Sequence, residues 1–125
     1  MSEEKMCQEL CDFLSAIGYE SEIKIKKGQS LRYPLYVDKA FRDTPIEYLN
    51  LSVRSGHALK RAGYNTIGDM LDNIRSSKDL KNIRNCGDKC VREIMEHLCL
   101  HQISLLSPEK QQDYAKELVR LNTEV

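Results

Sequence analysis

A single glycine separates two short amphipathic runs between Asn82 and Leu98, where the sequence reads NIRNCGDKCVREIMEHL. Two helices joined by such a turn leave unpaired backbone N–H groups at the start of the second helix, together with the positive end of its dipole. This arrangement can bind a phosphate group. Gly87 would let the phosphate approach the backbone, and we expect the turn itself to require the conformational freedom of glycine. The pattern predicts a helix-hairpin-helix element, although plain helix-turn-helix packing without a ligand produces the same pattern.

The charge balance restricts any nucleic-acid contact to a local site. Lys plus Arg and Asp plus Glu each number 19, so the formal net charge is +0, and the chain lacks the overall basic character of many nucleic-acid-binding proteins. With few phosphate contacts, affinity should be modest and strongly dependent on salt. The basic residues that could share one groove are Arg54, Lys60, Arg61, Arg84, Lys89 and Arg92.

The cysteines and histidines are predicted to be structural. Five cysteines are an odd number in a chain whose acidic start, MSEEK, is unlike a signal peptide, so we expect reduced thiols in the cytoplasm. Two C-x-x-x-C pairs could place sulfur atoms on one helical face, but zinc motifs usually carry C-x-x-C, and we expect no metal and no cofactor. These residues are Cys7, Cys11, Cys86, Cys90 and Cys99, with His57, His97 and His101 as ordinary surface or half-buried histidines.

The first 43 residues are predicted to form a helix and a β-hairpin. Apolar residues at helical spacing predict a helix over residues 3–17, with Gly18 as its end. Alternation through Ile23 and Ile25, a turn near Lys27 and Gly28, and a second alternating run over residues 31–37 predict the hairpin. Pro34 would make the second arm an edge strand.

A second unit is predicted to start near FRDTP, because Asp, Thr and the residue before proline favour a turn. Ser52 is a plausible N-cap for a helix of about ten residues that ends at Gly63. Thr66 can cap the next helix, Ser76 or Ser77 a third, and a fourth follows Gly87 and ends near residues 100–102. These helices would form a compact, mainly α bundle over residues 44–106.

The last segment, SPEKQQDYAKELVRLN, predicts a C-terminal helix within residues 107–125, because Ser107 suits the N-cap and Pro108 the first helical position. Tyr114, Leu118 and Leu121 form its apolar stripe. We expect this stripe to pack on the rest of the protein, since an exposed stripe would be a partner-binding site.

The segment from Thr44 to about Leu105 resembles the C-terminal domain of the bacterial RNA polymerase alpha subunit. The resemblance rests on residues that keep their order and spacing over about half of the sequence: Pro45-Ile46, Val53-Arg54-Ser55, Leu59-Lys60, Ile67-Gly68-Asp69, and Gly87 with Lys89. It implies a compact helical domain that binds the A·T-rich minor groove of DNA and contacts RNA polymerase or transcription factors.

The resemblance places the family's principal DNA-contacting arginine at Arg54 and its hairpin glycine and lysine at Gly87 and Lys89. A narrow A·T minor groove concentrates negative potential, which attracts an inserted arginine without base-specific hydrogen bonds. The DNA-binding residues that we predict are Arg54, His57, Gly87, Lys89, Cys90 and Glu93. Glu93 lies four residues after Lys89, so the pair could equally serve the helix surface.

The sequence departs from the family pattern at four positions near this predicted interface. His57 replaces the usual Asn, Ala58 a Cys, Asp88 a basic residue and Cys90 a Ser. Ala58 has no side-chain hydrogen-bonding group, and a Cys thiol is a weaker partner than a hydroxyl. Asp88 would stabilise the helix start by about 0.3–1 kcal/mol but would repel a phosphate.

Two functions remain open from the sequence. The first is a free-standing, bacterial DNA-binding protein associated with transcription, because only about 44 residues precede the match and the assembly portion of an alpha subunit would need more. The alternative is a protein-interaction module that docks on RNA polymerase or a transcription factor with little DNA affinity of its own. No catalytic motif was found, so we do not expect an enzyme.

Overall fold

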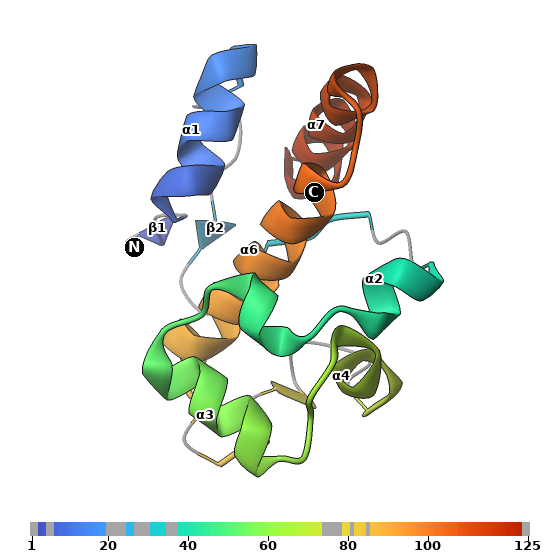
Figure 1. Cartoon of the computed structure of the whole chain (residues 1–125). Coiled ribbons are helices and arrows are strands. Elements are labelled where there is room, and N and C mark those ends of the chain that lie inside the picture. The colour runs from blue at the N-terminus through green and yellow to red at the C-terminus, as the bar shows by residue number, and fades with distance from the viewer. Residues whose placement is uncertain are drawn as a thin grey trace.

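The computed structural model describes residues 3–4, 7–19, 25–26, 31–34, 38–73, 79–80, 82–84 and 86–123, which are mainly helical (Figure 1). None of the described helices combines the length and hydrophobicity of a membrane span. The elements in chain order are β1 (Glu3–Glu4), α1 (Gln8–Ile17), β2 (Ile25–Lys26), α2 (Lys39–Asp43), the 3₁₀ helix η1 (Ile46–Leu49), α3 (Val53–Arg61), α4 (Ile67–Asn73), α6 (Asp88–Ser104) and α7 (Pro108–Thr123).

Helix α6 is the central element, because its buried side chains belong to two apolar clusters. Toward its N-terminus, Val91 and Ile94 pack in a cluster with η1, α3 and α4. Toward its C-terminus, Cys99 and Ile103 pack in a second cluster with α1 and α7. Figure 1 shows α6 running between α3 at one end and α1 with α7 at the other. Helix α6 therefore connects the two apolar clusters.

The N-terminal segment differs from its prediction. The helix begins at Gln8 rather than residue 3, and Glu3–Glu4 instead forms a strand that pairs antiparallel with Ile25–Lys26. The predicted hairpin is not confirmed, because Leu31–Pro34 belongs to no strand, while residues 23, 27–30 and 35–37 lie outside the described residues.

Tertiary contacts account for the conformation of Leu31–Pro34. Leu31 is buried in the cluster of α1, α6 and α7. The Pro34 carbonyl accepts hydrogen bonds from Gln102 Nε2 at 2.9 Å and from the Tyr114 hydroxyl at 2.7 Å. Side chains of two helices therefore hold this segment, which the alternating sequence pattern could not indicate.

Local capping chemistry confirms several predicted helix ends. Gly18 and Gly63 adopt left-handed backbone conformations, with φ of 91° and 93°, where glycine has no Cβ penalty. Ser52 caps α3 by accepting a hydrogen bond from the Ser55 N–H. The cap predicted at Ser76 or Ser77 lies outside the described residues. Helix α6 extends to Ser104, two residues beyond the predicted end near 100–102.

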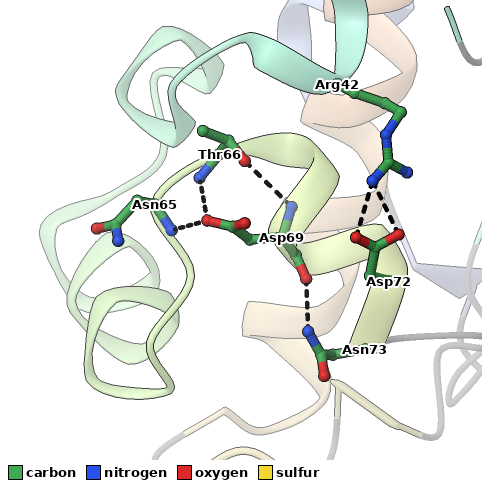
Figure 2. Close-up of polar contacts among 6 residues, drawn as sticks. All are labelled: Arg42, Asn65, Thr66, Asp69, Asp72 and Asn73. Atoms are coloured by element: carbon green, nitrogen blue, oxygen red, sulfur yellow. Dashed lines mark hydrogen bonds and ion pairs between the residues drawn. The ribbon is translucent and has the colours of Figure 1, made fainter. Parts of the chain in front are cut away.

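Thr66 caps α4 as predicted, through a reciprocal arrangement shown in Figure 2. Its Oγ1 accepts from the Asp69 N–H at 3.1 Å, while the Asp69 carboxylate accepts from the Thr66 N–H at 3.2 Å. This is a capping box with Asp in place of the usual Glu or Gln. One guanidinium nitrogen of Arg42 in α2, Nη2, donates to both carboxylate oxygens of Asp72 in α4, and this ion pair joins the two helices.

The C-terminal helix packs on the protein, as its apolar stripe predicts. Tyr114 and Leu118 are buried in the cluster with Leu10 and Leu14 of α1. Leu121 is half-buried. The predicted stripe is thus covered by the protein's own N-terminal helix and by α6.

Candidate nucleic-acid interface

The N-terminal ends of α3 and α6 border one surface pocket with a volume of about 930 Å³. Five of the six predicted DNA-binding residues line it. They are Arg54, Gly87, Lys89, Cys90 and Glu93. The sixth, His57, is not part of the lining but is exposed on α3, three residues after Arg54. The pocket therefore unites residues that are more than 30 positions apart in the sequence.

Glu93 holds the two helix starts together. Its carboxylate accepts hydrogen bonds from the Ser52 N–H at 2.8 Å, from the Ser52 hydroxyl at 2.9 Å and from the Ser55 hydroxyl. Burial opposes the ionised carboxylate, but the bonds from Ser55 and Ser52, with a smaller contribution from His97, lower the Glu93 pKa below its ordinary value. In this position Glu93 supports the start of α3, and with it the Arg54 backbone.

The first main-chain N–H groups of α6 precede the hydrogen bonds of the helix itself. Gly87 is the N-cap and provides no side-chain cap, and the first helical bond runs from the Val91 N–H to the Gly87 carbonyl at 2.9 Å. The N–H groups of residues 88–90 therefore precede the helical hydrogen-bond ladder. They carry the positive end of the dipole of a 17-residue helix.

The expectation that the turn requires glycine at position 87 is wrong. Gly87 has φ −86° and ψ −172°, an extended conformation open to any residue. A Cβ built there would meet no atom within 4 Å among the described residues beyond its two chain neighbours. The residue is exposed. The described residues therefore give no structural reason for glycine at this position.

Cys90 faces the interior rather than the solvent. It is 8% exposed, and its Sγ lies 2.9 Å from Cys86 Sγ and 3.3 Å from Ser55 Oγ. Burial is the largest cause that raises the pKa of the Cys86 thiol to about 12. The Cys90 side chain therefore contacts Cys86 before the helix and Ser55 of α3. Only the main-chain N–H of Cys90 remains as a candidate for contact with DNA.

The pocket contains equal numbers of acidic and basic side chains. Arg54, Lys89 and Arg92 contribute positive charge, and Asp88, Glu93 and Glu96 contribute negative charge. Within the described part of the protein, Arg54 and Lys89 are exposed and form no ion pair. These two cations are available to an anion, whereas Glu93 is engaged by serine hydroxyls.

Sequence reasoning missed a polar contact between two residues that line the pocket, Cys7 and Glu96. Cys7, the N-cap of α1, donates its N–H to Glu96 Oε1 at 2.6 Å. Glu96 is 4% exposed, and burial raises its pKa despite this hydrogen bond. The two residues are 89 positions apart, so no local spacing could have indicated the contact. Ser52 and Ser55, by contrast, carry the signature of a helix start.

Comparison with known proteins gives consistent relatives. The chain is 44% identical over 68 residues to the DNA-directed RNA polymerase subunit alpha of Moorella thermoacetica, a match that spans 54% of this protein and 21% of the relative. The subunit alpha of Thermosynechococcus vestitus is 46% identical over 66 residues, a match that spans 53% of this protein and 20% of the relative. The subunit alpha of Carboxydothermus hydrogenoformans is 35% identical over 89 residues, which span 71% of this protein and 26% of the relative. The chain thus spans about a fifth to a quarter of these relatives.

No solved structure matches this protein significantly. The family model of the C-terminal domain of the bacterial RNA polymerase alpha subunit matches residues 36–99. This region contains the elements from α2 to the first part of α6, and with them both helix starts that border the pocket. The protein therefore belongs to the family of bacterial RNA polymerase alpha C-terminal domains.

Proposed function

We propose that this protein binds DNA in association with transcription, with Arg54 entering an A·T-rich minor groove. The observation that carries the proposal is that Arg54 and the start of α6 line one pocket. The two contacts would be complementary. An arginine is attracted by the negative potential of a narrow minor groove. Amides at a helix start would bind the adjacent phosphate and so fix the position of the protein along the duplex. Lys89 would add a further phosphate contact.

RNA polymerase or a transcription factor is the proposed protein partner, and the cytoplasm the proposed location. The relatives are DNA-directed RNA polymerase alpha subunits. We propose that residues 44–106 are the DNA-contacting unit, while residues 1–43 and 107–125 are additions that support it.

The alternative proposal is a protein-interaction module with little DNA affinity. The balanced charges of the pocket favour it, because Asp88 stands at the helix start where a phosphate would bind. Tyr48 of η1 and Val53 at the start of α3, 66% and 74% exposed, would supply apolar contacts to a protein.

A duplex-binding experiment separates the two proposals. Fluorescence anisotropy at low salt should show tighter binding of wild type to an A·T-rich duplex than to a G·C-rich duplex of equal length, and Asp88→Lys should increase both affinities. Lys116→Ala, an exposed change on α7, is the control and should behave as wild type. If wild type and Asp88→Lys bind neither duplex while purified RNA polymerase captures the wild type, the interaction module is the function.

A further inference from the structure

Three residues of different types meet where the start of α1 lies against α6. One ligand atom from each of Cys7, Glu9 and His97 lies within 4.8 Å of those of the other two. Cys7 and His97 are half-buried, and Glu9 is exposed. A thiolate, an imidazole and a carboxylate are together the ligand types that Zn²⁺ takes in proteins. None of the contacts proposed for DNA uses this group.

The His97 ring is fixed in the tautomer that a metal requires. Its Nδ1 lies 2.6 Å from the Leu49 carbonyl oxygen. A carbonyl only accepts hydrogen bonds, so Nδ1 carries a proton, and in the neutral ring Nε2 then keeps its lone pair. Histidine ligands of zinc characteristically donate their other ring N–H to such an oxygen, which orients the ring.

The Cys7 thiol is held against α6 by its own backbone. The Cys7 N–H donates to Glu96 Oε1 at 2.6 Å, and Glu96 precedes His97 in the helix. Leu10, one turn further along α1, is fully buried against the cluster that includes Cys99 and Ile103 of α6. Cys7 and His97 therefore lie at the start of α1 and within α6, two helices that pack against each other.

We propose that Cys7, Glu9 and His97 bind one zinc ion, with water at the fourth tetrahedral position. Zn–S and Zn–N bonds of about 2.3 and 2.0 Å place the ligand atoms roughly 3.5 Å apart. Because the three ligand atoms already lie within 4.8 Å of one another, small side-chain movements would bring them to these distances. Binding releases the thiol proton to solvent as the S–Zn bond forms. Glu96, through the Cys7 N–H, is a positioning residue.

The ion would link residues 7–9 to position 97 and so fasten α1 to α6. Because the ligands come together only in the folded protein, zinc should raise the midpoint of thermal unfolding. This inference is independent of DNA binding, since zinc affinity is measured without a duplex.

Metal titration of the full-length, chelator-stripped protein in reducing buffer tests the site. Zn²⁺ in competition with a chromophoric chelator should bind at one ion per molecule, and Co²⁺ should give tetrahedral d–d bands with a thiolate charge-transfer band. Cys7→Ser should lose that band and bind Zn²⁺ more than about 100-fold more weakly. Cys11→Ser removes another half-buried thiol of α1 and should bind as wild type.

Glu9→Gln keeps the proposal falsifiable if Cys7→Ser does not fold, because Glu9 is exposed. This variant should retain the thiolate band and bind zinc about 10–100-fold more weakly. Absence of stoichiometric binding by wild type overturns the proposal. So does a spectrum that persists in folded Cys7→Ser, which would assign the metal to other thiols such as Cys86 and Cys90, or an affinity unchanged in Glu9→Gln.

Discussion

At the scale of a single residue, the fold does not require glycine at position 87, whereas the proposed DNA contact does. The extended conformation of Gly87 and the open space around its Cβ position allow alanine. Gly63 differs, because its φ of +93° disfavours any side chain. The two glycines look alike in the sequence but have different reasons to be present.

We therefore expect Gly87→Ala to change the free energy of unfolding by less than about 0.5 kcal/mol while weakening duplex binding several-fold, because its methyl group blocks approach to the amides of residues 88–90. Gly63→Ala should have the reverse pattern, losing about 1 kcal/mol of stability with little effect on the affinity of the folded fraction. Chemical denaturation and anisotropy measure the two effects. Equal DNA affinity of Gly87→Ala and wild type would exclude a phosphate at this helix start.

Residue-scale sequence reasoning succeeded where chemistry is local. The caps at Ser52 and Thr66 and the left-handed glycines at 18 and 63 follow from neighbours within four positions. Arg54 and Lys89 followed from a family resemblance. The Cys7–Glu96 contact crosses 89 positions, and the burial that turns Cys90 inward depends on how α3 packs, so neither had a sequence signal.

At the scale of elements, the Glu93 carboxylate fixes the start of α3 relative to α6. It receives the Ser52 N–H and both serine hydroxyls. Its pKa lies below the ordinary value of 4.5, so the unfolded protein takes up this proton at higher pH than the folded one. The resulting stability is complete above about pH 4.5 and is lost as pH falls through the folded pKa.

We expect Glu93→Gln to lower the free energy of unfolding at neutral pH by about 1–3 kcal/mol, because the amide group replaces one acceptor oxygen beside the serine donors. Below pH 4.5 the difference from wild type should shrink. Urea denaturation at several pH values measures this, with the exposed Glu109→Gln of α7 as control. A difference that is independent of pH would show that the Glu93 charge does not stabilise the α3–α6 contact.

The prediction of a β-hairpin in the N-terminal segment failed because the pairing of strands depends on contacts between distant residues. Alternation through Ile23 and Ile25 correctly indicated extended backbone at β2, but a strand pattern does not specify its partner. The partner is Glu3–Glu4, which lies before α1 rather than in the segment that follows β2. The segment Leu31–Pro34 alternates too, yet the Pro34 carbonyl bonds to Gln102 and Tyr114.

At the scale of the whole molecule, we expect cooperative unfolding, because α6 contributes buried side chains to both apolar clusters. Leu118 of α7 is fully buried in the cluster that also contains Cys99 and Ile103 of α6. Loss of packing there should therefore be transmitted through α6 to the pocket at its other end. Small single domains of this size commonly unfold in one transition.

Leu118→Ala should cost about 2–5 kcal/mol, because it removes buried methyl groups and leaves a cavity. Calorimetry should show one transition at a lower midpoint, whereas the exposed Lys116→Ala should leave the midpoint unchanged. Two separate transitions in Leu118→Ala would show that α7 and α1 form an independent unit.

The salt dependence of duplex binding by wild type and Arg54→Ala tests the central claim most directly, namely that Arg54 and the start of α6 contact DNA together. For wild type we expect weak binding to an A·T-rich duplex with log affinity falling linearly with log salt concentration. Arg54→Ala should weaken binding by about 1–3 kcal/mol and reduce the slope by about 1. An affinity and slope identical to those of wild type would contradict the account.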